Sequence, residues 1–161
     1  MALCLKSGLP VKADKLLKLL GYVVGWYIAL FLLYCMVGLV WNAGWTYVSM
    51  MNRAKESDVK VAAHGLQTAV EDYKKTPERK GQKPENSVEL GYVVADFLPE
   101  KVLMKVNPFN KDQRYGAGGI VFGSPGGPGQ IGYIFTGPNK HYQIVALGRV
   151  GTPIHTLQED P

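Results

Sequence analysis

An uncharged stretch of 34 residues, from Leu19 to Asn52, constrains this chain of 161 residues more than any other feature. A membrane-spanning helix needs about 20 consecutive, mostly apolar residues, so the stretch predicts one transmembrane helix, at residues 19–45. A secretory signal has a shorter apolar core and a small-residue cleavage site, and "WNAGW" (41–45) does not fit such a site. Since the chain also begins with a methionine, we expect a retained anchor.

Charges flanking this stretch predict its orientation. Residues 1–18 carry four lysines (Lys6, Lys12, Lys15, Lys18) against the single acid Asp14, whereas basic and acidic residues are mixed after Asn52. The positive-inside rule therefore predicts a cytoplasmic basic arm at residues 1–18 and places the C-terminal part outside. Aromatic rings near the end of the span are expected at the outer headgroups (Trp41, Trp45, Tyr47).

The overall charge of +5 does not indicate nucleic-acid binding. Residues 1–75 hold nine basic and five acidic residues (+4), and residues 76–161 hold nine and eight (+1), so the basicity mainly flanks the membrane. Anionic lipid explains such lysines without DNA or RNA. Both cysteines, Cys4 and Cys35, precede the external part, so we expect no disulfide framework there.

Residues 46–75 have the pattern of an amphipathic helix. Seven apolar residues recur at spacings of three and four: Val59, Ala62, Ala63, Leu66, Ala69, Val70 and Tyr73. No proline occurs between Val11 and Pro77, so the membrane helix is expected to continue into this segment, over about 55 residues. The stripe predicts one side of a protein core, and Glu71 and Asp72, beside two lysines, predict a solvated face.

Residues 76–161 are predicted to form an external head. A polar loop "TPERKGQKPENS" (76–87) ends the helix, and a short helix or turn follows in "VELGYVVADFLP" (88–99). Three runs have strand character, at Gln113–Phe122, Gln130–Thr136 and His141–Leu147, and "GPNK" (137–140) predicts a hairpin connection. The expected fold class is α+β, with the long helix packed on a small antiparallel sheet.

In this order, the segments resemble the type IV pilin and type II secretion pseudopilin superfamily. The similarity covers about residues 22–151: a membrane helix running into an amphipathic helix, then "FLPEKV", "NPF", "PGQIGYIF" and "YQIVALGRVG". The resemblance implies a long N-terminal helix laid on an antiparallel sheet, no active site, and partners bound through the helix. It also implies a bacterial inner membrane, with the head periplasmic or extracellular.

The chain departs from that family at the prepilin cleavage site. "KLLGYVVGW" (18–26) keeps Gly21 and the aromatic Tyr22, but Trp26 stands where the family has an early glutamate. In the family that buried carboxylate meets the terminal amine of a neighbouring subunit, and an unpaired one would be costly. We therefore expect a pilin-shaped subunit that stabilises a membrane complex without polymerising; the alternative is a pilin or pseudopilin that forms filaments after cleavage at Gly21.

Motifs for catalysis and ligand binding are weak. "GPGQIG" (127–132) matches a dinucleotide-binding glycine pattern, yet it is expected to open a strand and not a helix. The three histidines (His64, His141, His155) have no ligand at metal-binding spacing nearby. We expect neither an enzyme nor a cofactor, metal or small-molecule substrate.

Two regions are candidate contact sites. In the membrane, Gly21 and Gly25 form a small-xxx-small pair, and with Trp26 and Gly38 they are the predicted helix-packing residues. The aromatic tips in this span predict neighbouring membrane proteins or pigment-like ligands in addition to lipid. In the head, the glycine-rich loop 116–129 is the candidate docking surface, at Gly118, Gly119, Pro125 and Gly126.

Overall fold

A single helix carries both the apolar stretch and the amphipathic stripe. The computed structural model describes residues 11–79, 81–136 and 141–158, and α1 runs over 65 residues, Val11–Lys75. The chain divides into two compact units, Met1–Val48 and Ser49–Pro161, which we call the apolar unit and the head. The predicted continuity of the helix is confirmed. Its start at Val11 makes part of the predicted arm helical, and residues 1–10 lie outside the described residues.

The predicted stripe of α1 is buried in the head. All seven residues are at most 3% exposed: Val59, Ala62, Ala63, Leu66, Ala69, Val70 and Tyr73. Spacings of three and four place them on one side of a helix with 3.6 residues per turn, so they bury together against whatever covers that side. This prediction is confirmed residue by residue.

The end of α1 and the start of α2 follow from local capping. The Thr76 hydroxyl donates to the Tyr73 carbonyl at 2.7 Å, and Gly81, at φ 83°, donates its N–H to the Lys74 carbonyl at 3.0 Å. Asn86 is the N-cap of α2 (Ser87–Asp96), and its side chain accepts from the Glu89 N–H at 2.9 Å. The predicted short helix is therefore confirmed, and α3 (Glu100–Leu103) follows it.

Within the described residues, six strands form two sheets. β1 (Val106–Asn107) and β2 (Asn110–Arg114) make an antiparallel pair. The larger sheet has the order β3-β4-β5-β6, with β3 (Ile120–Phe122), β4 (Ile131–Thr136), β5 (His141–Leu147) and β6 (Pro153–Gln158). The predicted strands at 130–136 and 141–147 are confirmed, and the predicted connection 137–140 lies outside the described residues.

Two expectations about the sheet were wrong. Gln113–Phe122 is not one strand, because a turn with Gly118 at φ 85° separates β2 from β3. The larger sheet is not wholly antiparallel either, since β3 pairs with β4 in parallel register, Ile120 opposite Ile131. In the connection, residues 123–130, Gly123 and Gly129 take positive φ, and after it β4 runs in the same direction as β3.

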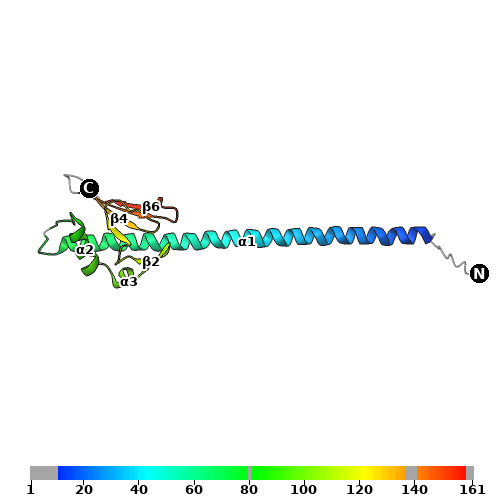
Figure 1. The fold of residues 1–161 in the computed structure, drawn as a ribbon, viewed down its shortest axis with the longest axis horizontal. Helices are drawn as coiled ribbons and strands as arrows, with labels where there is room; N and C mark the ends of the chain where they lie inside the picture. The colour runs from blue at the N-terminus through cyan, green and yellow to red at the C-terminus, as the bar shows by residue number, and fades with distance from the viewer. Residues whose placement is uncertain (1–10, 80, 137–140, 159–161) are drawn as a thin grey trace, which may run out of the picture. The chain divides into compact units, whose positions relative to one another are not determined.

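Figure 1 shows β4 and β6 along one side of the C-terminal part of α1, with α3 and β2 on the other side. Tyr133 and Tyr142 stack at 5.4 Å between ring centroids within the core, on neighbouring strands of the larger sheet. The Tyr142 hydroxyl donates to Glu71 Oε1 of α1 at 2.7 Å. Glu71 is therefore part of the helix–sheet contact and not the fully solvated residue that we expected.

Candidate functional site

The apolar unit exposes its hydrophobic side chains all round the helix. Trp26 is 69% exposed, Tyr34 78% and Trp41 78%, and no residue in the most apolar 18-residue stretch of the helix is buried. By length and composition this helix could cross a membrane, which is compatible with a membrane anchor. A helix that is hydrophobic on every side needs an apolar surrounding, because water solvates such a surface poorly.

Gly21, Gly25 and Trp26 share one groove on this helix. Tyr22 and Ala29 complete its lining, and a Cβ placed on either glycine would meet nothing within 4 Å. The predicted small-xxx-small pair is thus an open notch in the helix surface. Gly38 does not belong to it, since thirteen residues beyond Gly25 correspond to about 140° around the helix axis.

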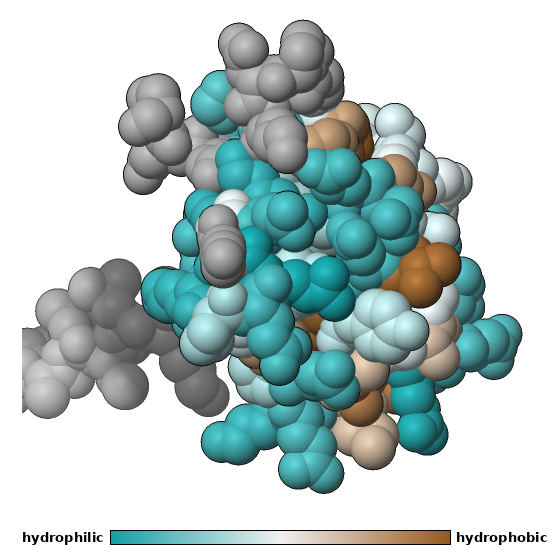
Figure 2. All heavy atoms as spheres, turned by 90° about the vertical axis from the view of Figure 1, so that its left-hand side faces the viewer, coloured by the Kyte–Doolittle hydropathy of each residue, from teal (hydrophilic) through white to brown (hydrophobic). Residues whose placement is uncertain are grey.

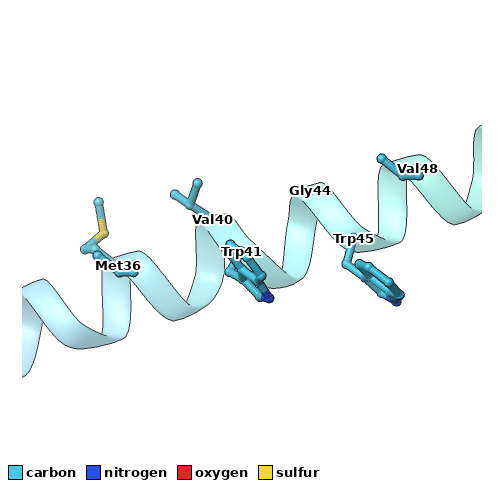
Figure 3. Close-up of a pocket in the computed structure, with 7 residues that line it drawn as sticks. Met36, Val40, Trp41, Gly44, Trp45 and Val48 are labelled. Atoms are coloured by element: carbon cyan, nitrogen blue, oxygen red, sulfur yellow. The ribbon is translucent and has the colours of Figure 1, made fainter.

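A second groove surrounds Gly44. In Figure 3 the indole rings of Trp41 and Trp45 project from one side of α1, Val40 and Val48 project from the other side, and Gly44 lies between the two valines. A Cβ on Gly44 would also meet nothing within 4 Å. Trp41 and Trp45 are four residues apart, and Val40, Gly44 and Val48 follow one another at spacings of four. The missing side chain at Gly44 therefore leaves a groove along the helix, the form into which a second helix packs.

Polar side chains brace the predicted docking loop, residues 116–129. Gln130 Oε1 accepts from the N–H groups of Gly126 and Gly127 at 3.0 and 2.9 Å, and Gln130 Nε2 donates to the Gly118 carbonyl at 3.4 Å. Asn107, fully buried, donates through Nδ2 to the Pro128 carbonyl at 2.9 Å. Buried amide groups of this kind need such partners, and here they hold the loop against the sheet.

The four candidate docking residues have different surroundings. Gly118 and Gly126 are exposed. Gly119 is buried and packs so closely that a Cβ there would lie 2.8 Å from the Arg114 carbonyl oxygen. Pro125 packs against Gly132. Gly118 and Gly126 are therefore the accessible part of this candidate surface, and Gly119 and Pro125 serve its packing.

The "GPGQIG" segment leads into a strand, as expected. Its last residues, Ile131 and Gly132, begin β4, and Gly129 takes φ 72° beside the Asn107 side chain. A dinucleotide loop would instead place a helix N-terminus at the phosphates. The glycine at 129 is explained by its positive φ and by the close approach of Asn107.

Two histidines from distant parts of the sequence meet on the head. His64 of α1 and His155 of β6 lie with their Nε2 atoms 3.1 Å apart and their ring centroids 4.9 Å apart. His64 is exposed and His155 is half-buried. Sequence reasoning missed this pair because 91 residues separate the two histidines and because β6 was not predicted.

The surroundings of the pair favour neutral imidazole at His155. Burial, the neighbouring His64 and the Lys60 ammonium together lower the pKa of His155. Within the described residues, no group of three or more histidine, cysteine, aspartate or glutamate side chains could hold a metal ion. The pair is thus a two-ligand cluster open to solvent on the His64 side.

Figure 2 shows one face of the head, where most of the described residues are hydrophilic. Water is therefore a suitable surrounding for the head, in contrast with the apolar unit. Comparison with family models, with curated proteins and with solved structures finds no match for this chain.

Proposed function

We propose that this chain is a non-catalytic, single-pass membrane protein that serves as a structural or accessory subunit of a larger membrane protein complex. In this proposal residues 19–45 lie in the inner membrane of a bacterium, the basic N-terminal side faces the cytoplasm, and the head is periplasmic or extracellular. Its partners are other integral membrane proteins and lipid.

The observation that carries the proposal is the exposure of apolar side chains in the first half of α1. From Leu16 to Met51 the large hydrophobic residues that are exposed number two dozen or more, among them three tryptophans. Such a surface in water would cost free energy roughly in proportion to its area, at about 25 cal/mol per Å². In a bilayer these side chains contact lipid chains in place of water, so the cost does not arise.

The two glycine grooves support protein neighbours in the bilayer. Between two apolar helices lipid exerts no hydrophobic force, so close backbone approach at small residues drives association. Tyr22 lines the first groove, and two indole rings line the second. Aromatic rings with a polar tip favour sites where the tip can form a hydrogen bond.

A substitution in the second groove tests the proposal. Gly44→Leu fills the gap between Val40 and Val48, so we expect less of the chain to co-purify with its complex in mild detergent. Ala43→Leu places the same leucine side chain one residue away and outside the residues that line the groove. The proposal would be contradicted if the wild-type chain migrated as a monomer in native electrophoresis and both variants migrated in the same way.

The second candidate is a filament subunit, a pilin or pseudopilin. The observation that favours it is the burial of the α1 stripe under a small sheet, the arrangement that the family resemblance implies. Mass spectrometry of native protein and electron microscopy separate the two candidates. A chain cleaved at Gly21 that forms thin homopolymeric filaments supports the second, and an uncleaved chain in a hetero-oligomer supports the first.

A further inference from the structure

We propose that His64 and His155 form a binding site for a divalent first-row transition metal ion, Cu²⁺ or Zn²⁺, on the head. The site joins β6 to α1 through the two Nε2 atoms, which lie 3.1 Å apart. It is independent of the proposed role in the membrane, because both ligands belong to the head.

The nitrogen and ring-centre separations of the pair both fit one metal ion between the rings. Two bonds of about 2.05 Å, the usual length from zinc to imidazole nitrogen, span 3.1 Å when they meet at about 98°. Each ring centre lies about 1.15 Å behind its Nε2, so the same angle places the ring centres about 4.8 Å apart, against the observed 4.9 Å. One position of the ion therefore accounts for both distances.

A simple hydrogen bond between the rings predicts a different pair of distances. If one Nε2–H pointed straight at the other Nε2, the ring centres would lie about 5.4 Å apart at the observed nitrogen separation. The shorter centroid distance means that the ring axes converge to one side, where a shared ion would sit. In the metal-free protein the same gap holds a bent hydrogen bond, in which the tautomers decide which ring donates and which accepts.

The donor set selects the class of metal. Neutral imidazole suits copper and zinc, and for a given set of nitrogen ligands Cu²⁺ binds more tightly than its neighbours in the first row. An angle of about 98° lies between the square-planar and tetrahedral values, so it accommodates either ion. Water completes the coordination, since among the described residues no third histidine, cysteine or carboxylate joins the pair.

Lys60 provides an internal control on electrostatics. It lies one helical turn before His64 and acts on His155 as a neighbouring positive charge. A cation bound between the rings would feel the same repulsion, so Lys60→Gln is expected to tighten metal binding while leaving both ligands in place.

The experiment uses the full chain in detergent, without a polyhistidine tag. Zn²⁺ binding is measured by competition with a chromophoric chelator, and the bound Cu²⁺ is examined by electron paramagnetic resonance. We expect one ion per chain, coupling to two imidazole nitrogens, and affinity at least about tenfold lower for His64→Gln and for His155→Gln. His141→Gln, which alters the third histidine, is the matched control and should bind as the wild type does.

Three results would overturn the inference: no stoichiometric binding, copper spectra lacking two equivalent nitrogen couplings, or unchanged affinity in both ligand variants. Far-ultraviolet circular dichroism of each metal-free variant checks that the head is folded. If His155→Gln unfolds the edge strand, His64→Gln alone decides, because His64 lies on the exposed side of α1. Tighter zinc binding in Lys60→Gln with unchanged copper spectra would confirm that the lysine acts through its charge.

Discussion

The two halves of α1 have a similar helical backbone but opposite burial. Before Val48 the large apolar side chains are exposed on every side, whereas from Val59 to Tyr73 the apolar stripe is buried and the remaining positions are largely polar. The difference shows that the distribution of apolar residues around a helix, and not their number, decides which surrounding it needs. A helix that is apolar on every side needs lipid or other helices around it, and a helix with one apolar stripe packs that stripe against a sheet.

The largest expected effect comes from placing charge in the apolar half. Leu32→Arg with Leu33→Arg should cost about 5–7 kcal/mol of membrane insertion, because each arginine at the centre of a span costs about 2.5–3.5 kcal/mol. Extraction by alkaline carbonate should therefore release more of this variant than of the wild type. Val61→Arg with Val150→Arg adds the same charge at exposed sites of the head and should leave extraction unchanged.

Removing apolar volume from the stripe should have the next largest effect. Leu66 is fully buried, so Leu66→Ala is expected to lower the free energy of unfolding of the head by about 2–5 kcal/mol. Leu33→Ala removes the same atoms from the exposed half and should leave that free energy unchanged. Equal losses for the two variants, measured by denaturant unfolding in detergent, would break the contrast between the halves.

The contact between α1 and β5 gives a smaller effect. Tyr142→Phe removes the hydroxyl that donates to Glu71 Oε1, and hydrogen bonds to a charged group are worth about 1.5–3 kcal/mol. We expect a loss near the lower end, because the Lys74 ammonium also donates to this carboxylate at 3.2 Å and remains in place. Tyr92→Phe, at an exposed position of α2, is the control.

The smallest effect concerns pH. Burial, with a lesser contribution from Asp58, raises the pKa of Tyr115 well above its ordinary value near 10. Both the folded and the unfolded chain hold this proton below pH 10; above it the unfolded chain releases the proton first, so stability falls as pH rises. Tyr115→Phe should make the alkaline loss of stability shallower.

At neutral pH the same variant should be close to neutral or slightly stabilising. The Tyr115 hydroxyl is buried without a hydrogen-bond partner among the described residues, so its removal leaves no other group unsatisfied. A loss of more than about 1 kcal/mol in chemical unfolding at pH 7 would show that the hydroxyl has a partner after all. Tyr92→Phe again serves as control, because its exposed hydroxyl already contacts water.

Local periodicity explains which predictions succeeded. The α1 stripe, α2 and the strands at 131–136 and 141–147 all have repeats that can be followed within a few residues. The short strands at 106–107 and 120–122 have too few residues to show any alternation, and "PIHTLQ" (153–158) mixes apolar and polar residues at an edge. Their pairing depends on neighbours distant in the sequence.

The candidate sites divide in the same way. Gly21 and Gly25 could be placed together from helical spacing alone, but the different side occupied by Gly38 required counting turns around the axis. In the loop 116–129, composition indicated positive φ, yet it could not distinguish exposed Gly118 from buried Gly119. That distinction depends on how Arg114 and Tyr115 pack against the turn.

The sequence by itself determined the long helix, its apolar half and the exact stripe that enters the core, because each depends on side chains three or four residues apart. Tertiary structure alone decided the parallel pairing of β3 with β4, the hydrogen bond from Tyr142 to Glu71 and the meeting of His64 with His155. A contact between residues 91 positions apart depends on how the sheet packs against the helix, and no local sequence pattern indicates that packing.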